Sequence, residues 1–192
     1  MCHPGVSRAT DRVSSKTVKP LSTGSYRSRG SLQDDNVNMK ILITGIAGFI
    51  GYHTAQRLLA RGDDVIGVDN FNDSYDPTLK RARIADLKNQ YPGVKIYEID
   101  IAEYQAFDAV FKSEQPDKVC HLAAQAGVRY SLTNPFTYER TNILGTLNIL
   151  GLGRENEVND LVYAASSSVY GNSKELPFAE ARIVGTIAEQ AR

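Results

Sequence analysis

Three glycines, Gly45, Gly48 and Gly51, stand between an apolar run at Lys40–Thr44 and a helical pattern at Phe49–Arg61. Such an unbroken apolar run is typical of a strand buried on both faces of a parallel sheet. The first glycine permits a tight turn, the second lets a pyrophosphate approach the backbone, and the third lets helix and strand pack closely. Free N–H groups at the start of the helix would attract the anion. The pattern favours a dinucleotide cradle over an ordinary strand-to-helix turn.

The rest of the chain alternates short β-rich runs with helical stretches. We expect strands over 64–68, 94–99, 118–122 and 161–166, and helices over 78–91, 103–114 and 135–157. Strand–helix–strand units of this length require right-handed crossovers, so the sequence predicts an α/β fold, a Rossmann-like doubly wound parallel sheet. The usual strand order is 3-2-1-4-5-6. No run resembles strand six, and we expect a sheet that is incomplete at its C-terminal side.

Three segments are expected from composition. Residues 1–38 are rich in Ser, Thr, Arg and Lys and lack periodicity, so we expect a disordered extension. We interpret it as sequence upstream of a natural start at Met39, with an organelle transit peptide as the alternative. Residues 39–180 carry the strand–helix alternation and are expected to form a partial dinucleotide-binding Rossmann domain, and 181–192 a divergent tail.

The charge balance excludes some partners. Lys and Arg number 22, as do Asp and Glu, which argues against nucleic acid or an anionic membrane as partner. The apolar stretch at 41–50 is too short to cross a bilayer. Cys2 and Cys120 lie far apart, so no disulfide framework and no metal site are expected, and a cytoplasmic location is the simplest interpretation.

Acids follow two of the expected strands. Asp69 ends the second strand, where a carboxylate can accept hydrogen bonds from both adenosine ribose hydroxyls and repel a 2′-phosphate. No arginine follows immediately, so NAD is favoured over NADP; the alternative is a solvated acid at a strand end. Asp100 and Ile101 follow the third strand, where a side chain can reach the adenine edge. His121 and Cys120 lie within the fourth strand, and we interpret both as packed core residues.

Further candidates lie later in the chain. Small residues at 123–127 would let the dinucleotide backbone come close to the fourth strand. Asn142 lies in the long helical segment and needs hydrogen-bond partners if it is buried, which a purely structural role also explains. Ser166, Ser167 and Ser168 follow the fifth strand, at the sheet edge where ligands of this fold bind. By themselves three serines are more typical of a polar turn.

Together these segments resemble the NAD-dependent epimerase/dehydratase family, the extended branch of the short-chain dehydrogenases/reductases, from residue 39 to about 180. Within that family the sequence resembles UDP-glucuronate 4-epimerases. Two segments carry this resemblance, namely 69–77 with Leu79 and Lys80, and 126–131 with Asn134 and Pro135. UDP-galactose epimerases usually lack the acidic insert in the first segment.

The resemblance implies NAD as cofactor, a UDP-sugar as substrate and, in full-length relatives, a possible homodimer. The residues that it places at NAD are Gly45, Gly48, Phe49, Ile50, Gly51, Asp69, Asn70, Asp100, Ile101, Leu122, Ala123, Ala124 and Asn142. It makes Ser166 the catalytic hydroxyl and puts Arg129, Ser167 and Ser168 near substrate. The implied reaction removes the sugar C4 hydride to NAD, rotates the 4-keto intermediate, and returns the hydride to the other face. Family dehydratases carry an Asp-Glu pair after the catalytic hydroxyl for acid–base chemistry. Here that pair is Ser167 and Ser168, which argues against a dehydratase.

One departure from the family concerns the catalytic base. Family members carry Tyr-x-x-x-Lys on a helix, in which the lysine lowers the tyrosine pKa. At the family's spacing from Ser166, positions 189–192 read Glu-Gln-Ala-Arg. Tyr170 and Lys174 have the spacing by chance, because residues 171–173 are poor helix formers. Similarity ends after Glu180, so we expect a copy truncated by a frameshift or stop and lacking epimerase activity. A non-catalytic NAD-binding module and a fragment without selected function are the alternatives.

Overall fold

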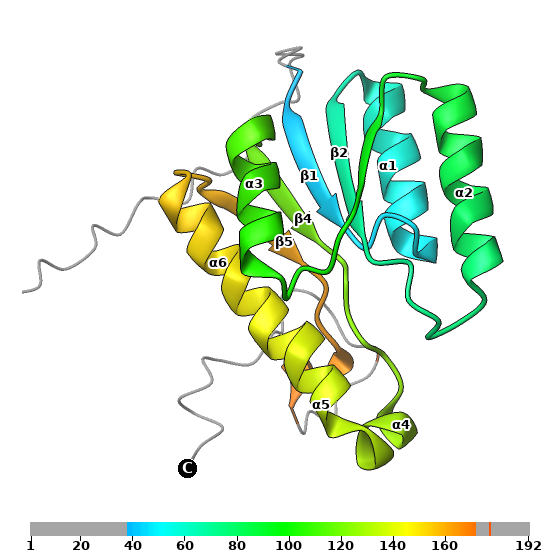
Figure 1. Ribbon diagram of the computed structural model, residues 1–192, viewed down its shortest axis with the longest axis vertical. Helices are drawn as coiled ribbons and strands as arrows, with labels where there is room; N and C mark the ends of the chain where they lie inside the picture. Colours follow the sequence, from blue (N-terminus) through cyan, green and yellow to red (C-terminus); the bar gives the residue numbers. More distant parts are fainter. Residues whose placement is uncertain (1–37, 172–176, 178–192) are drawn as a thin grey trace, which may run out of the picture. The chain divides into compact units, whose positions relative to one another are not determined.

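The computed structural model describes residues 38–171 and Pro177 (Figure 1). The expected disordered segment at 1–38, apart from Asn38, and the expected tail at 181–192 lie outside the described residues. So do Lys174 and the side chain of Ser168.

A five-stranded parallel sheet forms the centre of the fold, with strand order β3-β2-β1-β4-β5. Its strands are β1 (Lys40–Thr44), β2 (Asp64–Asp69), β3 (Lys95–Glu98), β4 (Lys118–His121) and β5 (Asp160–Tyr163). The doubly wound α/β prediction is therefore confirmed. Thr44 pairs with Val68 on one side and with His121 on the other, which brings the carboxyl ends of the central strands to one edge.

Helices cover both faces of this sheet (Figure 1). The covering helices are α1 (Phe49–Arg61) and α2 (Pro77–Gln90) on one face and α3 (Tyr104–Glu114) and α6 (Thr146–Glu155) on the other. The remaining helical segments are α4 (Val128–Thr133), α5 (Pro135–Tyr138), the π-helical segment η1 (Glu139–Gly145) and the 3-10 turn η2 (Ser167–Tyr170). Helix α1 ends at Arg61 and is capped by Gly62, whose φ of 100° suits a glycine and whose N–H donates to the Leu58 and Leu59 carbonyls.

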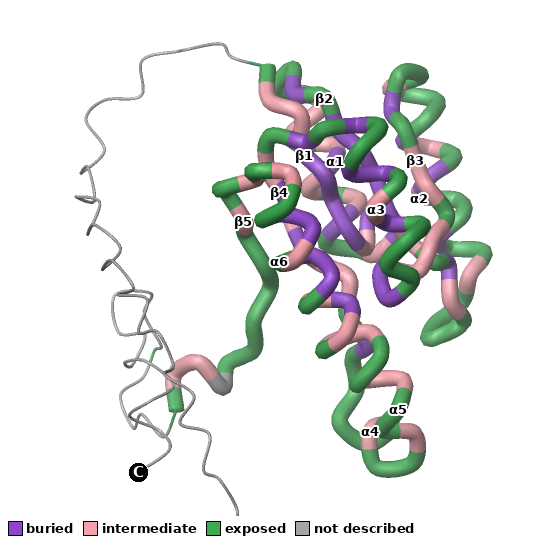
Figure 2. The backbone as a smooth tube through the Cα atoms, turned by 60° about the vertical axis from the view of Figure 1, so that its left-hand side comes forward, coloured by how far each residue is buried: buried purple, intermediate pink, exposed green. Residues whose placement is uncertain are grey.

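Alternation along the strands divides the core into two layers. Ile41 and Ile43 of β1 pack with Ala55 of α1 and Leu87 of α2 on one face. Leu42 points to the other face, into a cluster with α3 and α6 that includes Phe107, Phe111, Ile149 and Leu152. Figure 2 shows the buried residues running through the central strands and the inner sides of these helices. Because both faces are covered, the central strands read as unbroken apolar runs.

The C-terminal part of the sheet differs from the sequence expectation. The fifth strand ends at Tyr163 rather than at residue 166, and Ser167 begins a 3-10 turn. The expected long helix begins at Pro135 but contains the seven-residue π-helical segment η1, which hydrophobic periodicity cannot reveal. Helix α4 was not expected, because its six residues bury none of their side chains and so carry no amphipathic pattern.

Candidate cofactor site

Close backbone packing fixes the glycine turn between β1 and α1. Gly45 has a φ of 73°, and a Cβ at this position would lie 2.7 Å from the Ala123 nitrogen. A Cβ at Gly51 would lie 2.1 Å from the Gly45 carbonyl oxygen. Side chains are thus excluded at the first and third glycines, as a dinucleotide cradle requires. Gly48 is the N-cap of α1 and provides no side-chain cap, so the first-turn amides of the helix are donors that an anion could accept from.

Asp69 connects the end of β2 to this turn. Its Oδ2 accepts a hydrogen bond from the Ala47 N–H at 3.0 Å, and its Oδ1 accepts one from the Phe71 N–H at 2.9 Å. Phe71 has a φ of 50°, in the left-handed region that aromatic residues rarely adopt. Each carboxylate oxygen has two acceptor sites, so both keep capacity for a ribose hydroxyl.

A hollow at the carboxyl edge of the sheet brings most of the expected cofactor residues together. Eight of them line it, namely Gly45, Gly48, Asp69, Asn70, Ile101, Leu122, Ala123 and Ala124. Backbone amides, a carboxylate and small side chains suit a dinucleotide at such a crevice. The residues present therefore fit NAD. Phe49 and Ile50, in the first turn of α1, are 65% and 61% exposed, and Gly51 is buried under the turn.

Asn142 lies on η1 beside a neighbouring hollow, which it lines with His121, Leu122, Ala123 and Ala124. Its Oδ1 accepts from the Gln125 N–H at 2.8 Å, and its Nδ2 donates to the Gln125 carbonyl at 3.0 Å. This reciprocal pair fixes the chain after β4. The Asn142 side chain thus pairs with the backbone of the buried residue Gln125, which is the structural role that the sequence left open. It also lines the second hollow.

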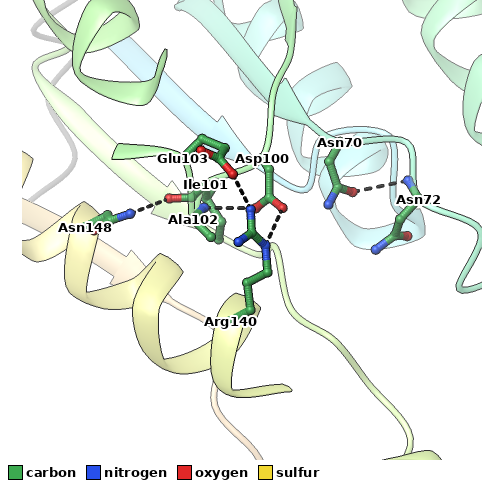
Figure 3. Close-up of polar contacts among 8 residues, drawn as sticks. All are labelled: Asn70, Asn72, Asp100, Ile101, Ala102, Glu103, Arg140 and Asn148. Carbon is green, nitrogen blue, oxygen red and sulfur yellow. Dashed lines mark hydrogen bonds and ion pairs between the residues drawn. The ribbon is translucent and has the colours of Figure 1, made fainter. Parts of the chain in front are cut away.

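Asp100 lies next to the hollow without lining it. Its Oδ1 accepts from the Ala102 N–H at 2.9 Å, and its Oδ2 accepts from Arg140 Nε at 3.2 Å (Figure 3). Arg140 also pairs with Glu103. The arginine reaches across from η1, so part of the Asp100 carboxylate is occupied by the protein itself. Asn148 supports the same segment by donating to the Ile101 carbonyl at 2.9 Å.

A buried histidine network beneath the site was not foreseen. Thr44 Oγ1 lies 2.7 Å from His121 Nδ1, and His121 Nε2 lies 3.1 Å from Thr146 Oγ1. Thr146 donates to the Asn142 carbonyl, so its oxygen can accept from Nε2–H. Thr44 Oγ1 in turn accepts the Leu122 and Ala123 N–H groups, so its own hydrogen can go to Nδ1. The neutral Nε2–H tautomer satisfies every member, and burial lowers the pKa of His121. The network joins β1, β4 and α6.

The residues expected at substrate lie apart from these two hollows. Arg129 is exposed on α4, and Ser166 and Ser167 are exposed after β5. Neither hollow is lined by them. Tyr163 and Ala164, just before the serines, do line the second hollow, which therefore opens toward the end of β5.

Other lining residues come from the loop after Asp69 and from α2. Asn72, Ser74, Tyr75 and Lys80 line the first hollow. Tyr75 and Arg83 both donate to the Ala47 carbonyl, at 3.3 and 3.1 Å, which holds the loop over the glycine turn. The segment 69–77, with Leu79 and Lys80, was identified in the sequence only by its resemblance to the family. The sequence does not show that Lys80 is buried.

A parallel sheet of this order with a glycine turn after β1 defines the class of Rossmann-like dinucleotide-binding folds. The family model described as GDP-mannose 4,6 dehydratase matches residues 42–185. The chain therefore belongs to the NAD-dependent epimerase/dehydratase family, in agreement with the resemblance noted in its sequence.

Curated relatives and a solved structure match about three quarters of the chain. It is 47% identical over 146 residues to UDP-glucuronate 4-epimerase 4 of Arabidopsis thaliana, covering 76% of this chain and 33% of the relative. It is 48% identical over 139 residues to a UDP-glucuronate 4-epimerase of Thermodesulfobacterium geofontis, covering 72% and 42%. A solved UDP-glucose 4-epimerase from Bifidobacterium longum, in complex with NAD+ and UDP, superposes with a TM-score of 0.65 at 34% identity, over 76% of this chain and 42% of that one.

The chain spans between 33% and 42% of the length of these relatives. Within the described residues, no helix is both long and apolar enough to span a membrane.

Proposed function

We propose that this chain carries the NAD-binding part of a nucleotide-sugar 4-epimerase that acts on UDP-glucuronate. The observation that supports this most is the meeting of the glycine turn, Asp69 and the 70–76 loop in one hollow. That loop belongs to the segment in which the sequence resembles UDP-glucuronate 4-epimerases. The two curated relatives of that description share 47% and 48% of aligned residues with the chain.

In this proposal the residues have separate tasks. The first-turn amides of α1 hold the pyrophosphate, and Asp69 accepts hydrogen bonds from the adenosine ribose. Ala123 and Ala124 leave room for the dinucleotide beside β4. Bound NAD supplies reversible oxidation at the sugar C4 position. Ser166 is the hydroxyl that would hold the sugar there, with Arg129 and the neighbouring serines binding the rest of the substrate.

A chimaera tests the assignment to this reaction. Residues 39–170 would replace the aligned segment of the Thermodesulfobacterium geofontis epimerase, and conversion of UDP-glucuronate to UDP-galacturonate would be followed by chromatography. We expect a folded, active chimaera that loses activity with Ser166→Ala. A folded chimaera that binds NAD but does not turn over this substrate would contradict the proposal.

The 192 residues by themselves are proposed to bind NAD without epimerising the sugar. Positions 189–192 hold Glu-Gln-Ala-Arg where the family spacing places its Tyr-x-x-x-Lys pair. Loss of a general base costs about 10²–10⁴ in rate. Turnover of UDP-glucuronate by the purified chain would refute this. The residues at positions 189–192 also favour a second candidate function, a non-catalytic NAD-binding module. An inactive chimaera with intact NAD affinity would support that module.

A further inference from the structure

Arg83, a half-buried residue in the second turn of α2, places its guanidinium group against the glycine turn. Its Nη1 donates to the Ala47 carbonyl oxygen at 3.1 Å and to the Tyr75 hydroxyl oxygen at 2.9 Å. The same hydroxyl donates to the Ala47 carbonyl at 3.3 Å. Two side chains that also contact each other therefore meet on one backbone oxygen of the turn.

Both backbone groups of Ala47 are held by side chains in this way. Its N–H donates to Asp69 Oδ2 at 3.0 Å, and its carbonyl accepts from Arg83 and Tyr75. Because a peptide bond is planar, fixing the Ala47 carbonyl also fixes the N–H of Gly48, which is the N-cap of α1. Arg83 therefore helps to set the direction in which the chain enters α1, and with it the position of the first-turn amides.

The guanidinium also brings a positive charge to the turn. Among residues 38–171 and Pro177, none of the ion pairs involves Arg83. Its Cζ lies 5.9 Å from the centroid of the Phe49 ring and 5.8 Å from that of Tyr75, within the range of a cation–π contact. A carbonyl oxygen carries partial negative charge and repels a nearby anion, and a cation bonded to that oxygen offsets the repulsion. An arginine here therefore favours the binding of an anion at the turn.

We propose that Arg83 is a positioning residue for the pyrophosphate of the dinucleotide. It holds the Ala47 carbonyl, with Tyr75 as the second donor, so that the peptide leading into α1 is ordered before the anion binds. The role rests on the proposed NAD binding and deepens it, since it names what keeps the turn in shape. A residue that only joined α2 to α1 would stabilise the fold without favouring any one part of the ligand.

The test uses the full chain and two ligands that share the adenosine, of which ADP-ribose carries the pyrophosphate and adenosine carries no phosphate. Arg83→Met removes the donors and keeps an apolar stem. Arg83→Lys keeps the charge but replaces the planar guanidinium by a point charge on a flexible stem. Arg57→Met is the matched control, because it removes the charge of an exposed arginine from α1. Affinities are measured by calorimetry, directly for ADP-ribose and by displacement of ADP-ribose for adenosine.

We expect Arg83→Met to weaken ADP-ribose by about tenfold, the worth of a hydrogen bond to a charged group, and to leave adenosine unchanged. Arg57→Met should leave both ligands unchanged. Arg83→Lys should bind ADP-ribose more weakly than the wild type, because the planar donor is lost although the charge is kept.

Three results would overturn the proposal. Equal penalties for ADP-ribose and adenosine in Arg83→Met would show that Arg83 serves only the loop that walls the hollow. Wild-type affinity of Arg83→Lys for ADP-ribose would show that the charge alone suffices. Wild-type affinity of a folded Arg83→Met would show that the residue has no part in binding. Absence of ADP-ribose and NAD binding by the folded wild type would instead refute the proposed function, and this role with it.

A measurement on the wild type covers the case in which the variants do not fold. Coupling is reciprocal, so an anion that binds better to the ordered turn must also hold the guanidinium more firmly. In chain labelled with ¹³C and ¹⁵N, the Arg83 side-chain signals are identified by through-bond correlation to the backbone. Saturating ADP-ribose should slow hydrogen exchange of this guanidinium by about tenfold, and saturating adenosine should not. Exchange that ADP-ribose leaves unchanged would overturn the proposal.

Discussion

The third glycine of the turn offers a test in which geometry and helix propensity have opposite effects. Gly51 lies in the first turn of α1, where alanine is intrinsically favoured by up to about 1 kcal/mol. A Cβ there would lie 2.1 Å from the Gly45 carbonyl oxygen and 2.8 Å from the Ile46 Cα, both of them backbone atoms that cannot rotate away. Overpacking of this kind costs about 3 kcal/mol. We therefore expect Gly51→Ala to destabilise the fold by about 2 kcal/mol.

Urea unfolding measures this effect directly. With a slope of about 2 kcal/mol per molar, the midpoint should fall by about 1 M. The matched control is Gly151→Ala on α6, where a Cβ meets no atom within 4 Å. Propensity acts alone there and should stabilise by about 0.5–1 kcal/mol. Because Gly51→Ala also moves the helix start away from the turn, NAD should bind more weakly. A Gly51→Ala midpoint equal to or above the wild-type value would refute the close packing described for this turn.

Two further predictions concern the charge and protonation of the site. Asp69→Asn removes the charge and leaves an acceptor for only one of the two backbone N–H groups that Asp69 binds, so we expect NAD affinity to fall by about tenfold or more and the preference over NADP to shrink; an unchanged ratio of calorimetric affinities would contradict this. His121 is held neutral because burial lowers its pKa. Its contribution to the free energy of unfolding is complete above the unfolded pKa of about 6.5 and is lost as pH falls through the lowered folded pKa. The free energy of unfolding should therefore decrease from pH 7.5 to pH 5.5 more steeply in the wild type than in His121→Gln, by at most about 1.4 kcal/mol per pH unit; parallel pH profiles from urea unfolding would count against the neutral network.

Local patterns predicted the central part of the fold well. Lys40–Thr44 and Phe49–Arg61 were predicted with the bounds that the structure has, because an unbroken apolar run and a glycine stop are properties of neighbouring residues. The π-helical segment η1 was missed. Its register departs from the helical period where Asn142 pairs with Gln125 and Gly145 lies against Ile101, and both are contacts between distant segments.

The site shows the same division. The glycines and Asp69 could be found from the sequence, since a turn and a strand end place them. The roles of Lys80 and His121 could not, because each depends on which distant groups surround it. His121 reads as a packed residue in a strand, yet it joins three elements through two threonines. Lys80 is a charged side chain, and its burial depends on the loop after Asp69, whose Asn72 carbonyl accepts from its ammonium group.

Titration of the full chain with NAD by calorimetry, with NADP in a parallel experiment, tests most directly whether this fold is a cofactor cradle. We predict binding at a single site, with NADP weaker by about tenfold or more because of the Asp69 charge. At a concentration 100 times the dissociation constant, NAD should also raise the free energy of unfolding by about 2.7 kcal/mol. A cooperatively folded chain that shows neither heat of binding nor stabilisation at millimolar NAD would contradict the account.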